Sequence, residues 1–287
     1  MDILARIQEN TKDFSKGQKR IAAFILESYD KAAFMTASRL GKQVGVSEST
    51  VVRFAAELGF EGYPSMQQEL QKMIRSRLTS VQRIAVAQDR IGSQDVLDSV
   101  LPLDIEKIRQ TLEELDRESF YRATDAIAAA RKINIVGVRS SQALAVFLHF
   151  YLSLIFDGVV LVSANSASEV FERLFWVGPE DVVLGISFPR YSTRTVEAMK
   201  FARDRGATTV AITDSEASPL ARESKYTLTA RSDMASFVDS LVAPLSLVNA
   251  LLVEVSRKKD DNLGKTFQSL EKIWEDYGVY QKAVETE

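Results

Sequence analysis

Three short polar stretches in the second half of the chain could together bind an anion. Each follows a run of β-branched residues: INIVGV leads into RSS, VVLGISF leads into PRYSTRT, and TTVAIT leads into DS. Hydroxyls, backbone N–H groups and arginine side chains at helix N-termini suit a phosphate or a carboxylate. Serine and threonine at such positions also commonly cap helices without binding anything. The candidate anion-binding residues are Arg139, Ser140, Ser141, Ser187, Arg190, Ser192 and Thr193.

A second polar group lies near the N-terminus, in the stretch VSESTVVRFAAELGF over 46–60. Gly41, Gly45 and Val51 precede or enter it at spacings of four and six residues. This is the pattern of a helix-turn-helix, in which the first glycine lets two helices approach, the second permits a left-handed turn, and the valine fills their shared core. Because the second helix of this motif enters the major groove of DNA, the spacing predicts binding to duplex DNA.

The predicted DNA-binding residues fall on two successive helices. Arg53 can make a bidentate contact with guanine, and Ser49 and Thr50 can bond to a base or a phosphate. Arg39 and Lys42 on the preceding helix are expected to contact phosphates, which fix register without reading sequence. The alternative is a small helical bundle in which Arg53 is only solvated. The full candidate set is Thr36, Arg39, Lys42, Ser47, Glu48, Ser49, Thr50 and Arg53.

The candidate DNA-binding residues require an all-helical module to position them. Ser15 with Gln18 forms a capping-box signal, and Thr36 and Ser47 can cap two further helices. Gly59 stands where the third helix should end, and a fourth should begin near Pro64. We predict an all-α helix-turn-helix domain over 1–77, followed by a polar and partly helical linker over 78–103.

The remainder, 104–287, predicts an α/β domain. Five short β-branched runs alternate with helical stretches, which is typical of a doubly wound parallel sheet covered on both faces. Ligands in such sheets bind beyond the carboxyl ends of the strands, where the three polar stretches fall. A long apolar helix at about 236–256 and an amphipathic helix at about 265–278 should complete the domain.

Composition limits the chemistry that the chain can perform. The 287 residues contain no cysteine and one histidine, His149, which excludes disulfides and thiolate metal sites. Residues 1–80 hold 12 basic and 9 acidic residues, whereas the rest holds 24 basic and 30 acidic. The longest apolar stretch, ALAVFLHFYLSLIF, is shorter than the ~20 residues of a membrane span. We expect a cytoplasmic protein without a metal or cofactor, whose basic first part faces DNA.

An enzyme that isomerises sugars through an enediol is the second hypothesis. Such chemistry needs a base held over the substrate, for which Glu169, Glu172 and His149 are candidates. His149 lies within an apolar helical stretch, and the two glutamates lie in an amphipathic one, so no persuasive catalytic set emerges. We therefore prefer a DNA-binding protein that binds its ligand without converting it. The isomerase remains the alternative, in which the N-terminal helices would serve docking or oligomerisation.

The chain resembles the RpiR-type transcriptional regulators. The resemblance rests on SKGQKRIAAFIL and TASRLGKQVGVSESTVVRFAAELGFEGYPSM, of which TVVRF and LGFEGY are the most specific parts. It continues into the second half, which is similar to a sugar isomerase (SIS) domain. This resemblance implies a DNA-binding repressor or activator controlled by a phosphosugar or a related metabolite.

Two loops depart from the pattern that this family usually shows. GVRSS stands where GxGxS is usual, so Arg139 replaces the second glycine. ISFPRYSTRT stands where an S-x-S-G-x-T phosphate loop is usual, and it brings Pro189 and Arg190. The added arginines suggest a more anionic effector, such as a sugar-acid phosphate or a carboxylate. Because an operator with two-fold symmetry calls for a symmetric protein, we also expect a homodimer or homotetramer.

Overall fold

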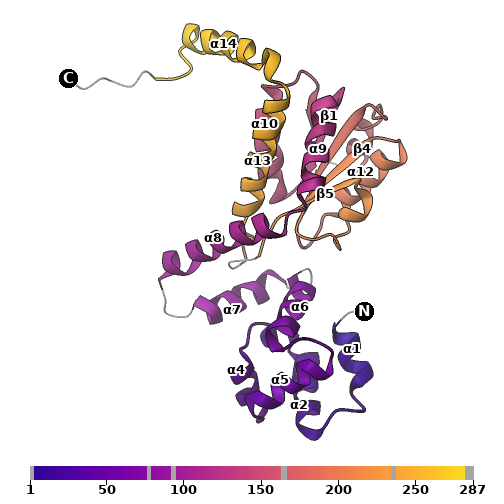
Figure 1. Ribbon diagram of the computed structural model, residues 1–287, viewed down its shortest axis with the longest axis vertical. Helices are drawn as coiled ribbons and strands as arrows, with labels where there is room; N and C mark the ends of the chain where they lie inside the picture. The colour runs from indigo at the N-terminus through magenta and orange to yellow at the C-terminus, as the bar shows by residue number, and fades with distance from the viewer. Residues whose placement is uncertain (1–2, 76–78, 92–94, 163–166, 234–236, 282–287) are drawn as a thin grey trace, which may run out of the picture. The chain divides into compact units, whose positions relative to one another are not determined.

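The computed structural model describes residues 3–75, 79–91, 95–162, 167–233 and 237–281 (Figure 1). The chain forms two compact units. The first comprises Met1–Leu103 together with Asp233–Ser240, and the second comprises Asp104–Ser232 together with Leu241–Glu287. Each unit has a hydrophobic core of its own.

The N-terminal unit is helical, as the sequence predicts. Ser15 and Gln18 make both bonds of the capping box, and the backbone N–H of Ser15 donates to Gln18 Oε1 at 2.8 Å. Ile21, Leu40 and Phe54 are fully buried in its core. Its helices are α1 (Ile3–Asn10), α2 (Lys16–Glu27), α3 (Tyr29–Ala32), α4 (Ala37–Val44), α5 (Glu48–Glu57), α6 (Tyr63–Arg75) and α7 (Ser80–Ile91).

The segment expected to be only partly helical is more regular than its sequence suggests. A capping box begins α7, because the Thr79 N–H donates to Gln82 Oε1 at 3.0 Å and Thr79 Oγ1 accepts from the Gln82 N–H. The next helix, α8 (Val96–Glu114), passes through Pro102 without ending and continues into the second unit. Because proline normally breaks a helix interior, the continuity of α8 was not evident from the residues alone.

The second unit is built on a parallel sheet with strand order β2-β1-β3-β4-β5. Each strand coincides with one of the predicted β-branched runs: β1 (Lys132–Gly137), β2 (Val159–Leu161), β3 (Asp181–Ile186), β4 (Thr208–Thr213) and β5 (Tyr226–Thr229). The helices of this unit are α9 (Arg117–Ala129), α10 (Ser141–Ser153), α11 (Ala167–Arg173), α12 (Thr193–Asp204), α13 (Val242–Lys258) and α14 (Asp260–Asp276).

Both faces of the sheet are covered, which confirms the doubly wound fold. Ile133 and Ile135 of β1 belong to the core that includes residues of α9, α10 and α13, whereas Val136 belongs to the core that includes residues of α11 and α12. Helix α13 begins at Val242 rather than near 236. This start places Pro244 in the first turn, where proline is tolerated.

Candidate functional site

Helices α4 and α5 form a helix-turn-helix. Gly45 ends α4 in the left-handed conformation, with φ of 67°, and the Val46 N–H donates to the Gly41 carbonyl at 2.8 Å. A Cβ added to Gly41 would lie 2.8 Å from the Val46 carbonyl oxygen, so this position admits only glycine without a shift. Val51 is fully buried beneath the turn. The two glycines and the valine therefore perform the roles that their spacing predicts.

Ser47 organises the N-terminus of α5 with its hydroxyl. This hydroxyl accepts from the Thr50 N–H at 3.3 Å and lies 2.9 Å from the hydroxyls of both Ser49 and Thr50. Thr50 is half-buried, and its methyl group would contact a Cβ at Gly17 of α2. Ser47 and Ser49 are exposed, so they are better placed than Thr50 to meet a nucleic acid.

Arg53 is exposed on α5 and folded back along the helix. Its Nε donates to the Ser49 carbonyl at 3.3 Å. On α4, Arg39 and Lys42 are also exposed, and Thr36 caps the helix by accepting from the Arg39 N–H at 3.2 Å. Exposed Glu48 occupies the first turn of α5, where its negative charge stabilises the helix through the helix dipole but repels phosphate.

The sequence reasoning missed Arg20 of α2. Its guanidinium donates to the Gly45 carbonyl at 2.7 Å, which places an exposed positive charge beside the turn of the motif. No local pattern announces this contact, because the two residues lie 25 positions apart. Lys16 and Lys19 are also exposed on α2.

A second candidate site lies at the carboxyl edge of the sheet in the second unit. The strand order reverses direction at β1, which has β2 on one side and β3 on the other. The helices that follow β1 and β3, α10 and α12, pack on opposite faces of the sheet. Such a topological switch point opens a crevice at the strand ends, and it is the usual ligand site of this fold class.

Two arginines at this edge have strained backbones. Arg139 follows β1 with φ of 56°, and Arg190 follows β3 with φ of 70°. Within the described residues they are the two non-glycine residues with positive φ. The left-handed conformation costs a side-chain-bearing residue ~1–2 kcal/mol, and strain of this kind clusters at functional sites.

The loop after β3 is held by its own hydroxyls. Buried Ser187 accepts from the Ser192 N–H at 3.0 Å, and Ser192 caps α12 by accepting from the Thr195 N–H at 3.3 Å. Thr195 is fully buried, and its Oγ1 has no hydrogen-bond partner in the described part of the chain. Tyr191 donates to Asp214 Oδ1 at 2.8 Å, which ties this loop to the loop after β4. The sequence reasoning missed this tie between the loops.

The remaining candidates are placed at the starts of α10 and α12. Ser140 is exposed and makes no side-chain capping bond, whereas Ser141 is buried as the first residue of α10. Thr193 is the exposed first residue of α12. The sheet thus brings the residues after β1 and those after β3 to adjacent strand ends.

The residues considered for catalysis have ordinary structural contacts. Glu169 pairs with Arg173 one turn along α11, at 2.9 Å, and Glu172 is exposed. Half-buried His149 has Nε2 3.5 Å from Ser153 Oγ, which is too long for a strong bond. Among the described residues, no group of three His, Asp or Glu side chains could hold a metal ion, and none of the helices could cross a membrane.

The first unit carries a helix-turn-helix, and the second is a doubly wound domain with a candidate ligand site at the carboxyl edge of its sheet. This combination is that of a DNA-binding regulator with a sensor domain. Residues 1–77 match the helix-turn-helix domain of the rpiR family, and residues 126–254 match the SIS domain. The sugar isomerase domain of the RpiR transcription factor from Sphaerobacter thermophilus is 30% identical, with a TM-score of 0.59, over 62% of this chain and 99% of that one. The chain belongs to the RpiR family of transcriptional regulators.

Two further comparisons span nearly the whole chain. The HTH-type transcriptional regulator HexR of Escherichia coli is 25% identical over 94% of both chains. The NanR protein of Vibrio vulnificus, in a complex with ManNAc-6P, is 22% identical with a TM-score of 0.60, over 96% of this chain and 98% of that one. The family and its named regulators support regulation of transcription, not sugar isomerisation, as the function of this chain.

Proposed function

We propose that this regulator binds an anionic sugar phosphate at the β1–β3 strand ends and that the bound effector changes its affinity for operator DNA. Helix α5 enters the major groove, with Arg53 reading a base and with Ser47 and Ser49 near the phosphates. Arg39 and Lys42 add phosphate contacts from α4. The protein acts in the cytoplasm as a homo-oligomer, because the two half-sites of a symmetric operator require two copies of α5.

The observation that carries the effector proposal is the pair of left-handed arginines. A glycine would adopt φ of 56° or 70° without strain, so an arginine at either position is retained at a cost to stability. The guanidinium group is the side chain that binds carboxylate and phosphate with two parallel bonds. Buried Thr195 adds an unpartnered hydroxyl in the first turn of α12. The ManNAc-6P complex of the structural relative is consistent with a phosphorylated ligand for this fold.

Substitution of Arg139 separates ligand binding from folding. Arg139→Gly removes the guanidinium and relieves the backbone strain, whereas Arg139→Ala removes the guanidinium and keeps the strain. We expect both variants to lose affinity for the effector, with Arg139→Ala close to the wild type in stability and Arg139→Gly at or above it. The gain should be at most ~1 kcal/mol, because glycine also loosens the unfolded chain.

Thermal unfolding measures both the stability of each variant and its affinity for the effector. The ligands are a panel of sugar phosphates, with and without a carboxylate. A ligand at ~100 times its Kd should stabilise the wild type by ~2.7 kcal/mol. The proposal predicts that one or more phosphorylated members give this shift and that both Arg139 variants reduce it. Wild-type shifts in both variants would place the effector elsewhere.

A further inference from the structure

The connection between β5 and α13 belongs partly to the N-terminal unit. Its residues Asp233–Ser240 cluster with that unit, although β5 and α13 are core elements of the second one. Within the N-terminal unit, Asp239 accepts from the guanidinium of Arg83 on α7, with Nη1 and Oδ1 2.6 Å apart. These two residues lie 156 positions apart in the sequence.

Arg83 is buried to an unusual degree for an arginine. Its side chain is 2% exposed, and that of Asp239 is 19% exposed. Removing two charges from water costs several kcal/mol for each ion, and apolar residues of similar volume often stabilise a protein as well or better. The pair is therefore poorly explained by stability alone. What it does provide is a fixed position of α7 relative to Asp239.

Helix α7 is also attached to the helical bundle that carries the helix-turn-helix. Gln82, the residue before Arg83, donates from Nε2 to Asp30 Oδ2 of α3 at 3.4 Å. Ala87, one turn further along α7, is buried. A displacement of Asp239 would consequently displace α7, and α7 contacts the DNA-binding bundle.

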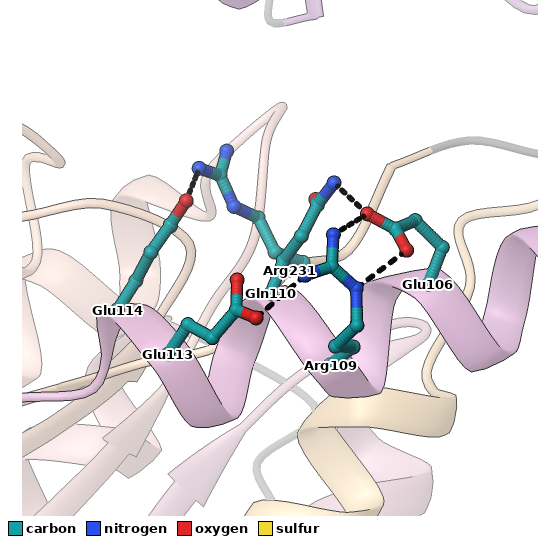
Figure 2. A network of polar contacts seen from close by, with 6 residues as sticks. All are labelled: Glu106, Arg109, Gln110, Glu113, Glu114 and Arg231. Atoms are coloured by element: carbon teal, nitrogen blue, oxygen red, sulfur yellow. Dashed lines mark hydrogen bonds and ion pairs between the residues drawn. The ribbon is translucent and has the colours of Figure 1, made fainter.

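The other end of the connection is fixed within the second unit. The Arg231 N–H donates to Thr111 Oγ1 of α8 at 2.9 Å, and the Arg231 guanidinium pairs with Glu114 (Figure 2). On the same helix, Arg109 joins Glu106 and Glu113 in a chain of exposed charge pairs (Figure 2). Beyond Asp239 the chain enters α13 at Val242, and Leu251 and Val255 of that helix are fully buried in the core.

We propose that the Arg83–Asp239 ion pair, which lies within the N-terminal unit, couples α7 to the backbone that enters α13. The chain from β5 to α13 starts at the carboxyl edge of the sheet, which is the edge that bears ligands in this fold class. A shift of α13 moves Asp239 through Ser240 and Leu241, and the ion pair passes this shift to α7. Arg83 is a positioning residue in this account and does not contact DNA or effector.

Hydrogen exchange of the full-length protein tests the coupling without an effector. The DNA is a duplex selected from a random pool by the wild-type protein. In the wild type, DNA should slow exchange in α4 and α5 and should also change exchange in two remote segments, β5 and the first turns of α13. In Asp239→Asn, the protection of α4 and α5 should persist and the remote change should be lost. A role confined to stability would raise exchange around the substitution while leaving the remote response to DNA in place.

Two matched variants make the result interpretable. Arg122→Gln breaks an ion pair on α9 in which both side chains are more than half exposed, and it should leave the remote change intact. Asp239→Glu keeps the charge pair but lengthens one partner by a methylene, and it replaces Asp239→Asn if the latter fails to fold; the remote change should then shrink. A wild type without any remote change, or a folded Asp239 variant that retains it in full, would overturn the proposal. Either result leaves the effector site proposed at the β1–β3 strand ends untouched.

Discussion

Arg53 is the residue on which sequence-specific DNA recognition depends in our account. Its Nε donates to the Ser49 carbonyl at 3.3 Å, and a bidentate contact with a base requires two N–H groups of the same guanidinium. Arg53→Ala should weaken binding to the selected duplex by ~1–3 kcal/mol and relax specificity at one base pair. Competition binding against duplexes substituted at each position measures both effects.

Lys42→Ala is the matched variant for this prediction. Because a phosphate contact carries no sequence information, it should weaken all duplexes alike and reduce the slope of log K against log salt by ~0.9. If Arg53→Ala also weakens every duplex equally, Arg53 is a phosphate contact and not a base reader.

Tyr63 links the stability of the DNA-binding bundle to alkaline pH. Its buried hydroxyl donates to the Met35 carbonyl at 2.6 Å, and burial raises the pKa of Tyr63 to about 12 from 10.0. The unfolded chain loses this proton at lower pH than the folded chain does. The contribution of Tyr63 is therefore complete below pH 10 and falls between pH 10 and 12.

Tyr63→Phe should lose ~0.5–1.5 kcal/mol of stability at neutral pH and show a smaller alkaline fall than the wild type. Urea unfolding at several pH values measures both, with the exposed Tyr121→Phe as control. Equal alkaline falls in the wild type and in Tyr63→Phe would show that this proton is not linked to folding.

At the scale of elements, the close approach of α4 and α5 is the most demanding contact of the first unit. Gly41→Ala would place a methyl group 2.8 Å from the Val46 carbonyl oxygen. We expect it to destabilise the protein by ~1–3 kcal/mol and to reduce DNA binding, because the turn must open. Gly264→Ala on α14, where the added Cβ meets nothing within 4 Å, should instead be neutral or stabilising. Thermal unfolding of both variants decides this, and a harmless Gly41→Ala would contradict the tight turn.

Local signals in the sequence predicted most of these elements. Ser15, Thr36 and Ser47 cap the helices that they were expected to cap, and Gly59 ends α5 in the left-handed region with φ of 77°. The β-branched runs became strands of a parallel sheet whose inner strands, β1, β3 and β4, are almost wholly buried. Helix α3 was not predicted, since its single turn, YDKA, is too short to show a period.

Contacts between distant residues could not be predicted in the same way. The Arg83–Asp239 pair spans 156 positions, and Arg83 stands in a segment that the sequence suggested to be polar and partly helical. The positive φ of Arg139 and Arg190 was hidden as well, because arginine seldom adopts it and only the surrounding loop enforces it. The sequence indicated that these arginines carry charge to the strand ends, but the strain became evident only in the structure.

At the scale of the whole molecule, the effector can change DNA affinity only as far as its own affinity differs between the DNA-binding and non-binding states. A tenfold to hundredfold response corresponds to ~1.4–2.8 kcal/mol of coupling free energy. Since coupling is reciprocal, DNA must change the affinity for the effector by the same factor. A factor different from one distinguishes a regulator from a DNA-binding protein that merely tolerates a sugar phosphate.

The most direct test measures both sides of this cycle on the full-length wild-type protein. The ligand is the sugar phosphate with the largest thermal shift, and the DNA is the selected duplex. Fluorescence anisotropy gives the Kd for DNA at zero and saturating ligand, and calorimetry gives the Kd for the ligand with and without DNA. Our account predicts that the two ratios are equal and differ from one by at least tenfold. A ligand that stabilises the protein but leaves the Kd for DNA unchanged would contradict it.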